Sequence, residues 1–374
     1  SNSAWAFAKL SHQEPMLMKR LAEEVTSRAG SFDPQGLSNT GWAFATLGLR
    51  NHRLMDAITD EMLAGITRWS SQNIGNLTWS FAKLKLMNRK MVDAVCAEVT
   101  HTIYDWNPQG IANVIWSFAR LQVQDPDFYS IVAKECTQKI NSFQPQNLVN
   151  VAWSYAKLRM KEVGLFKAIG AAVLRKVPDF SPQHCSNAAW AFGTLGLADA
   201  PVLSAVAERV IHSSRACHAQ DLANVAWAFA KLVCLNKDLM AAVSGEVIRK
   251  VITFQPQNLS ITAYAFGQLH VPDKAVLDAI MEESERKMRE FDAQGLSNLC
   301  QAMAKTSCPN FAVLKLITSE AEGRLPQFTN QELAMVAWSL AKLGVLEGAP
   351  LAALAHETRA RLDRLTPQDL SVLV

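Results

Sequence analysis

The sequence predicts an all-α protein, a right-handed α-solenoid of about ten helix-turn-helix repeats of 37 residues each. Two columns of residues with this period indicate the fold. Tryptophan recurs at Trp5, Trp42, Trp79, Trp116, Trp153, Trp190, Trp227 and Trp338, with Tyr264 and Gln301 at the same period. Glutamine recurs at Gln35, Gln72, Gln109, Gln146, Gln183, Gln220, Gln257, Gln294, Gln331 and Gln368. No insertion or deletion disturbs the period, so we expect one repeat domain over residues 1–374, with repeats starting near these glutamines.

We number each repeat from this glutamine, position 1, and expect its first helix to begin two residues earlier. A residue that can cap a helix stands there at Asp33, Ser70, Asn107, Ser181, Asp292, Thr329 and Thr366. Proline often follows, where its missing N–H costs nothing, at Pro34, Pro108, Pro145, Pro182, Pro256 and Pro367. We expect this helix to stop about thirteen residues further on, near Gly48, Gly196 or Gly344.

Apolar and small residues assign the faces of the first helix. Positions 3, 10 and 13 are apolar, as in Leu148, Tyr155 and Leu158, and are expected in the core. Positions 4, 7 and 11 are mostly small, which would let neighbouring first helices approach closely. A second amphipathic helix follows. A large apolar residue then ends the repeat and is expected to pack between repeats, at Phe32, Trp69, Trp106, Phe143, Phe180, Phe254, Phe291 and Phe328.

A first cationic column occupies position 31, late in the second helix. Six of its seven members follow a glutamate at position 27 by four residues, and the seventh is Lys176. The pairs are Glu24 with Arg28, Glu135 with Lys139, Glu246 with Lys250, Glu283 with Lys287, Glu320 with Arg324 and Glu357 with Arg361. This order and spacing favour ion pairs of about 0.2–0.5 kcal/mol each. We therefore interpret this column as structural.

A second cationic column occupies position 12 of the first helix and has no acidic neighbour. Its members are Lys9, Lys83, Arg120, Lys157, Lys231, Lys305 and Lys342. Positions 3 to 13 contain no acid in any copy, so these segments carry +7 within a chain whose net charge is +3. A nearly neutral chain thus contains a basic stripe, which suits phosphate groups.

The stripe shares one helical face with positions 1, 5 and 8, because these positions are three or four residues apart. Position 5 is asparagine at Asn2, Asn39, Asn76, Asn113, Asn150, Asn187, Asn224 and Asn298. Position 2 varies among polar residues, and its candidates for base selection are Asn73, Asn147, His184, Asp221 and Asn258. A constant scaffold beside a variable polar position is what a one-unit-per-base reader of single-stranded RNA requires. The alternative is structural: asparagines bonded to neighbouring backbone and tryptophans packed between helices without a ligand.

Motifs and composition indicate a binding protein and not an enzyme. The sequence lacks GxxxxGK[ST], GxGxxG, HExxH and GxSxG, and no apolar run approaches the roughly 18 residues of a membrane span. Seven cysteines without a CxxC pair argue against a disulfide framework and for a reducing compartment. Cys185 and Cys217 stand in the core-leucine and apolar-end columns, so no metal site is expected with the adjacent His184 and His218. We expect no cofactor, no metal and no membrane partner.

The period, together with QNLVNVAWSYAKL at 146–158 and QDLANVAWAFAKL at 220–232, resembles the heptatricopeptide repeat family over nearly the whole chain. The chain is also similar to octotricopeptide repeat proteins and to the helical regions of FAST-kinase-like and RAP-domain organellar proteins. This resemblance implies helix-pair solenoids that bind RNA in mitochondria or chloroplasts, in RNA processing, stability, translation or ribosomal RNA association. The implied RNA binding applies least to the last three repeats, because they depart from the pattern at Ile261, Tyr264, Gln301, Met303 and Met335. No RAP-like domain lies within the chain, so no nuclease-related activity is implied.

We therefore expect a protein that binds single-stranded RNA, an organellar mRNA or rRNA, through the position-12 cations and the asparagine column. Protein partners are also expected. The expected location is the mitochondrion, with the chloroplast as the alternative. The alternative function is a scaffold that receives a peptide or partner helix in its groove. Ser1 and Val374 both fall inside a repeat, so we expect a longer natural protein whose targeting segment lies outside this chain.

Overall fold

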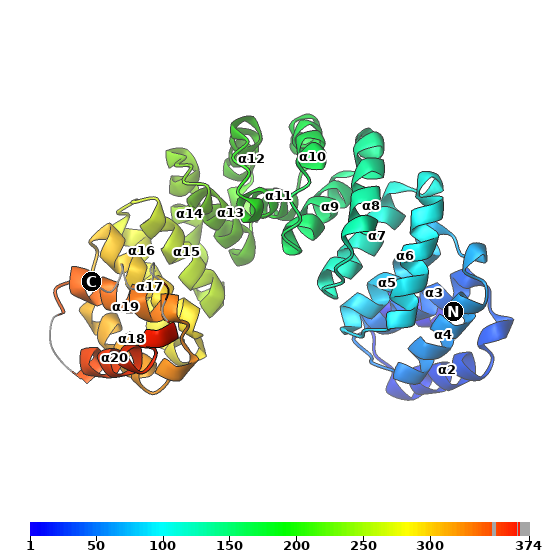
Figure 1. The fold of residues 1–374 in the computed structure, drawn as a ribbon, viewed down its shortest axis with the longest axis horizontal. Coiled ribbons are helices and arrows are strands. Elements are labelled where there is room, and N and C mark those ends of the chain that lie inside the picture. The colour runs from blue at the N-terminus through cyan, green and yellow to red at the C-terminus, as the bar shows by residue number, and fades with distance from the viewer. Residues whose placement is uncertain (346–348, 365, 367–374) are drawn as a thin grey trace. The chain divides into compact units, whose positions relative to one another are not determined.

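A computed structural model describes residues 1–345, 349–364 and 366, and every regular element within them is a helix, which confirms the predicted fold class (Figure 1). The α-helices are α1 (Asn2–Lys9), α2 (Pro15–Ser27), α3 (Pro34–Thr46), α4 (His52–Ala64), α5 (Ser71–Leu84), α6 (Arg89–Thr102), α7 (Pro108–Arg120), α8 (Pro126–Lys139), α9 (Pro145–Lys157), α10 (Val163–Lys176), α11 (Pro182–Leu195), α12 (Ala200–His212), α13 (Ala219–Lys231), α14 (Lys237–Lys250), α15 (Pro256–Gln268), α16 (Lys274–Arg286), α17 (Ala293–Thr306), α18 (Phe311–Glu322), α19 (Asn330–Lys342) and α20 (Ala349–Ala360). The expected features at Pro367 and Gln368 lie outside the described residues.

A short 3-10 helix follows each even-numbered helix of the described chain. These turns are η1 (Ala29–Ser31), η2 (Ile66–Arg68), η3 (Ile103–Asp105), η4 (Ile140–Ser142), η5 (Val177–Asp179), η6 (Ser214–Ala216), η7 (Val251–Thr253), η8 (Met288–Glu290), η9 (Leu325–Gln327) and η10 (Leu362–Arg364). They lead directly into the apolar residue that ends the repeat. The sequence pattern did not predict them.

The helices divide into two compact units, residues 1–176 and residues 177–374, and each is described by itself. Odd-numbered helices are the first helices of the repeats, and even-numbered helices are the second helices. In the first unit α3 packs on α5 and α5 on α7, and in the second unit α13 packs on α15 and α15 on α17. Each unit is therefore a solenoid of stacked helix pairs. A single domain over residues 1–374 stays a prediction.

The first helices begin at the predicted caps. The side chain accepts a hydrogen bond from the backbone N–H three residues later at Asp33, Ser70, Asn107, Ser181, Asp292 and Thr329. Thr366 is described, but the helix that it would cap lies outside the described residues. In these six copies the cap fixes where the first helix starts, and so it fixes the register of the repeat.

Position 14 ends every described first helix with a left-handed backbone conformation. The three glycines predicted there, Gly48, Gly196 and Gly344, have φ of 70°, 65° and 76°. The other copies adopt φ between 51° and 60° with a side chain present, at Ser11, Lys85, Gln122, Arg159, Val233, His270 and Ser307. The stop is thus a property of the repeat and not of glycine alone, although a side chain in this conformation costs about 1–2 kcal/mol.

Small residues bring neighbouring first helices into backbone contact, as predicted. A Cβ added to Gly193 would lie 3.0 Å from the Cα of Ala228, and one added to Gly267 would lie 2.9 Å from the Cα of Ala302. The residues predicted in the core, Leu148, Tyr155 and Leu158, are buried. So are the apolar residues that end the repeats, with the exception of Phe32, which is half-buried.

The position-31 cations form all six predicted ion pairs with the position-27 glutamates. They also make a contact that the sequence did not reveal. In five copies the cation donates to the backbone carbonyl of the apolar residue that ends the preceding repeat, at Lys139, Lys250, Lys287, Arg324 and Arg361. We call this contact the carbonyl clamp. Because the clamp joins successive repeats, it confirms the structural interpretation of this column.

Candidate functional site

Positions 1, 5, 8 and 12 of the first helices lie where a ligand can reach them, and we call these four columns the polar face. The glutamines at position 1 are exposed in the nine described copies. From Asn39 to Asn298 the asparagines are half-buried, and so are the tryptophans at position 8 except the exposed Trp5. Six of the seven position-12 cations are exposed, and Lys305 is half-buried. This exposure agrees with the predicted grouping on one face.

Tryptophans of the polar face pack on one another in pairs. Ring centroids lie 6.2–6.4 Å apart in the pairs Trp42–Trp79, Trp116–Trp153 and Trp190–Trp227. Each of these contacts joins neighbouring first helices, so part of each indole serves packing, as the structural alternative holds. The rings stay half-buried, which leaves a part of each at the surface.

Three of the position-12 cations lie beside indoles of the tryptophan column. Lys9 Nζ is 5.4 Å from the ring centroids of both Trp5 and Trp42, and Arg120 and Lys342 lie over the indoles at position 8 of their own helices. Within the described chain none of the seven cations forms an ion pair with an acidic side chain. The basic stripe is therefore available for an external anion.

Lys305 is the exception in this stripe. Its Nζ donates to the Oε1 atom of Gln268, the residue that stands at position 12 of the preceding repeat. Burial, aided by the nearby charge of Lys342, lowers the pKa of Lys305. This cation is thus directed into the protein, and the sequence pattern alone did not distinguish it from the others.

From Asn39 to Asn298, the asparagines of the polar face, with one exception, make no side-chain hydrogen bond to another described residue. Asn150 accepts a hydrogen bond from Gln146 at 2.9 Å. In the other copies from Asn39 to Asn298 no side-chain hydrogen bond to another described residue is present, at Asn39, Asn76, Asn113, Asn187, Asn224 and Asn298. The backbone bonding of the structural alternative is thus not observed. Half-buried amides without partners can donate to and accept from a ligand.

Position 2 has a local role that the sequence interpretation did not include. Asn73, His184, Asp221 and Asn258 each accept a hydrogen bond from the N-cap backbone N–H of their own helix. Asp221 is 6% exposed, and its other carboxylate oxygen accepts from Ser186 Oγ at 3.0 Å. These side chains are committed to helix caps, so their use in base selection stays a prediction.

Asn147 differs from the other position-2 candidates. It is half-buried, and its side chain has no hydrogen bond to another described residue. Of the five candidates it is therefore the one whose amide is wholly free to contact a base.

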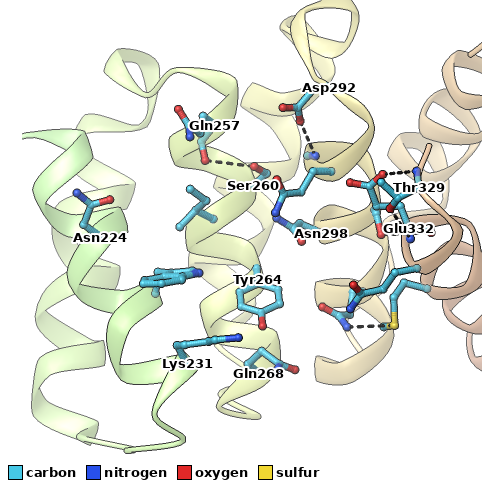
Figure 2. Close-up of a pocket in the computed structure, with 18 of the residues that line it drawn as sticks. Asn224, Lys231, Gln257, Ser260, Tyr264, Gln268, Asp292, Asn298, Thr329 and Glu332 are labelled. Atoms are coloured by element: carbon cyan, nitrogen blue, oxygen red, sulfur yellow. Dashed lines mark hydrogen bonds between the residues drawn. The ribbon is translucent and has the colours of Figure 1, made fainter. Parts of the chain in front are cut away.

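A groove of about 520 Å³ lies on the polar face of the second unit. Its walls come from α13, α15, α17 and α19, with Trp190 of α11 at one end, and include Trp227, Tyr264, Gln268 and Gln301. Figure 2 shows Tyr264 above Gln268 on α15, with Lys231 to the left of Tyr264 and Asn298 above it to the right. Its volume lies within the roughly 300–1,000 Å³ typical of small-molecule sites. The groove falls where the sequence departs most from the repeat pattern.

The cysteines behave as core residues. Cys185 and Cys217 are buried, as their columns predicted, and burial raises the pKa of Cys185 to about 12 and that of Cys217 to about 11. Among the described residues no group of histidine, cysteine and acidic side chains could hold a metal ion. In the same part of the chain no helix has both the length and the apolar character needed to cross a bilayer.

Stacked helix pairs with a repeated polar and cationic face define a helical-repeat binding protein. The chain belongs to the RESC6 family, described as RNA-editing substrate-binding complex 6 protein, which matches residues 111–369. Membership of this family indicates an RNA-binding role in an RNA-editing complex. The predicted RNA-binding repeat protein is confirmed at this level, whereas the particular heptatricopeptide family stays a prediction.

Comparison with curated proteins gives no match. Comparison with solved structures gives a match to a chain described as a homology model of the full-length AP-3 complex in an intermediate open conformation. The two chains are 12% identical, with a TM-score of 0.39, and the similarity covers 96% of this chain and 69% of that chain.

Proposed function

We propose that this chain binds single-stranded RNA along the polar face of its first helices, as the RNA-holding subunit of an RNA-editing substrate-binding complex. The family supplies the setting, because its name denotes a complex that binds RNA-editing substrates. Protein partners within that complex belong to the same proposal. The chain's own contribution is a stripe of cations for phosphates beside free amides for bases.

The contrast between the two cationic columns supports this proposal most strongly. Every position-31 cation with a glutamate four residues before it forms an ion pair, and five of them also hold the carbonyl clamp. The position-12 cations have no acidic partner in the described chain, although they lie on a regular array. A row of unneutralised cations along stacked helices matches the row of charges on a nucleic-acid backbone.

Charge reversal tests the proposal. We expect the triple variant Lys83→Glu, Arg120→Glu, Lys157→Glu to lose most of its affinity for a fluorescein-labelled single-stranded RNA of random sequence. Fluorescence anisotropy over a salt series measures the effect. Each lost phosphate contact flattens the slope of log affinity against log salt by roughly 0.7, so three lost contacts flatten it by about 2.

A matched triple on the second helices controls for net charge. Lys90, Lys134 and Lys167 are exposed and lie on α6, α8 and α10. Their replacement by glutamate changes the charge of the protein equally and is expected to leave most of the binding intact. Equal loss from both triples, with both proteins folded, would show that the polar face is not the RNA site. Wild-type protein that binds no RNA would favour the scaffold function, in which the face receives a peptide or partner helix.

The finer assignments belong to the same proposal. We infer membership of the heptatricopeptide repeat family from the 37-residue period, and a mitochondrial location with a role in RNA processing from the RNA-editing setting of the RESC6 family. The family match gives no support to the chloroplast or to ribosomal RNA as the target. Base selection is assigned first to the free asparagine amides and, at position 2, to Asn147.

A further inference from the structure

The groove of the second unit differs in chemistry from the rest of the polar face, and we propose that it receives one unpaired nucleobase of the bound strand. This inference rests on the proposed RNA-binding function and names where the strand would be read. Ile261, Tyr264, Gln301 and Met335, which depart from the repeat pattern, all line the groove. These four residues would thus form a base-binding site within the polar face.

An aromatic face is open in this groove. Trp227 stacks on Trp190 of the preceding repeat with an interplanar angle of 26°, which occupies one side of its indole. The next aromatic residue of the column is Tyr264, and no ring contact joins it to Trp227, although both are described and both line the groove. The other side of the Trp227 indole therefore faces a hollow. Stacking on such aromatic surfaces is the usual way in which proteins hold single-stranded bases.

A buried amide lies at the other side of the hollow. Gln301 stands in the tryptophan column of α17 and is 9% exposed. Its Nε2 lies 3.7 Å from the Met335 sulfur, a weak acceptor, and within the described residues its carbonyl oxygen accepts no hydrogen bond. A nucleobase edge carries both donors and acceptors, so it can satisfy this amide. Asn298, also free, lines the same groove.

The charges around the groove favour a neutral base over a phosphate. Lys305 donates a hydrogen bond to Gln268, so this cation is not available for a phosphate as the other position-12 cations are. The carboxylates of Asp292 and Glu332 line the groove and accept the backbone hydrogen bonds that cap α17 and α19 (Figure 2). Lys231 is the exposed cation of the lining. With two carboxylates and one exposed cation, the lining has a net negative charge that would repel a phosphate. A nucleobase is uncharged and is not repelled.

Two substitutions test the base site with labelled 20-nucleotide oligo(A), oligo(C) and oligo(U) as probes. Fluorescence anisotropy on the 374-residue chain gives the three affinities and their salt slopes. We expect wild-type protein to bind the three unequally. Tyr264→Ala should weaken binding of the preferred oligonucleotide roughly 5- to 150-fold, the usual effect of losing one stacking platform. Gln301→Met should reduce the preference among the three, and neither change should alter the salt slope because no phosphate contact is lost.

Gln138→Met provides the control for the amide. Gln138 is exposed on the second helix α8, so the same chemical change there should alter neither affinity nor preference. Wild-type binding that is unaffected by both Tyr264→Ala and Gln301→Met would overturn the base site and leave the proposed function intact. Absence of RNA binding by the wild-type protein would overturn both.

Photocrosslinking tests the site without any substitution, in case the buried Gln301→Met variant does not fold. Oligo(U) that contains 5-bromouridine is irradiated with the wild-type chain, and crosslinked peptides are identified by mass spectrometry. We expect adducts on Trp227 or Tyr264, because these rings would hold the base. Adducts confined to helices outside α11, α13, α15, α17 and α19 would overturn the assignment.

Discussion

At the scale of single residues, the left-handed position 14 shows how backbone geometry can be imposed on unsuitable side chains. Val233 has φ of 52° and is 80% exposed, so its side chain packs on little that could compensate. We expect Val233→Gly to stabilise the protein by about 1 kcal/mol, because glycine adopts this conformation without strain. Urea unfolding followed by circular dichroism measures the change.

The reverse substitution checks the cause. Gly196 occupies the same position with φ of 65°, and a Cβ added there would meet no atom within 4 Å. Gly196→Val should therefore destabilise the protein through backbone strain alone, by an amount similar to the gain at Val233. No change in stability at either site would show that a side chain in the left-handed conformation costs little free energy here.

The roles of individual residues can be predicted from the sequence where one local interaction decides them. The caps at Asp33 and Ser70 were predictable because a short polar side chain before a helix has one dominant use. Position 2 was not, because Asn73 can serve a cap as well as a ligand, and the periodicity does not choose between these uses. Lys305 was missed for a related reason, since its partner Gln268 lies 37 residues away.

At the scale of elements, the carbonyl clamp joins the second helix to the repeat before it in five copies. Lys250 Nζ lies 2.9 Å from both the Glu246 carboxylate and the Cys217 carbonyl oxygen, and 2.7 Å from the Arg215 carbonyl oxygen. We expect Lys250→Met to destabilise the protein by about 2 kcal/mol, because it leaves these acceptors without their charged donor. Chemical unfolding measures this loss, and RNA affinity should stay unchanged while the protein is folded.

Lys134→Met is the control for the clamp. Lys134 is exposed on α8, and its side chain makes no ion pair or hydrogen bond with another residue that the structure describes. This change should alter the free energy of unfolding by less than about 0.5 kcal/mol. Equal destabilisation by both variants would show that the clamp contributes nothing specific.

The acidic partner of a clamp makes stability depend on pH. A hydrogen bond from Lys287 holds the pKa of Glu283 below its usual range, with Arg286 as a further donor, although burial opposes the shift. A lowered folded-state pKa gives stability that is present above the unfolded pKa of about 4.3 and is lost as the pH falls through the folded value. Glu283→Gln should therefore be less stable than wild type at pH 7, and the difference should narrow below about pH 4.

Urea unfolding at a series of pH values measures this difference between the two proteins. The exposed neighbour Glu282 supplies the control, since Glu282→Gln should leave the pH profile close to that of wild type. A constant difference between wild type and Glu283→Gln from pH 7 to pH 3 would contradict the linkage.

At the scale of the whole molecule, the unbroken period allows one repeat to be removed without disturbing the register. Deletion of residues 109–145 joins Pro108 to Gln146 and restores the Pro-Gln start of a first helix. We expect the shortened protein to fold, because like interfaces meet at the junction. If the polar face reads about one nucleotide per repeat, the protected RNA segment shortens by about one nucleotide. Nuclease footprinting measures it, and an unchanged footprint would indicate a cradle that does not count bases.

Most of the architecture could be predicted because the same residue pattern recurs in successive repeats, so each copy supports the same interpretation. The helix pairs, the small residues between first helices and the polar face all follow from columns that agree across copies. The groove could not be predicted in this way, because it forms where the columns disagree. In the sequence, Gln301 and Met335 only replace the usual tryptophan and asparagine of their columns. The structure shows that they line one groove together with Trp227 and Tyr264.

The carbonyl clamp also gives the array a direction. In every clamp the accepting carbonyl lies 33 residues before the donating cation in the chain. During synthesis from the N-terminus, the acceptor of each contact is therefore made before its donor. Each new repeat can fasten backward onto a neighbour that is already complete, so the order of translation and the order of assembly coincide.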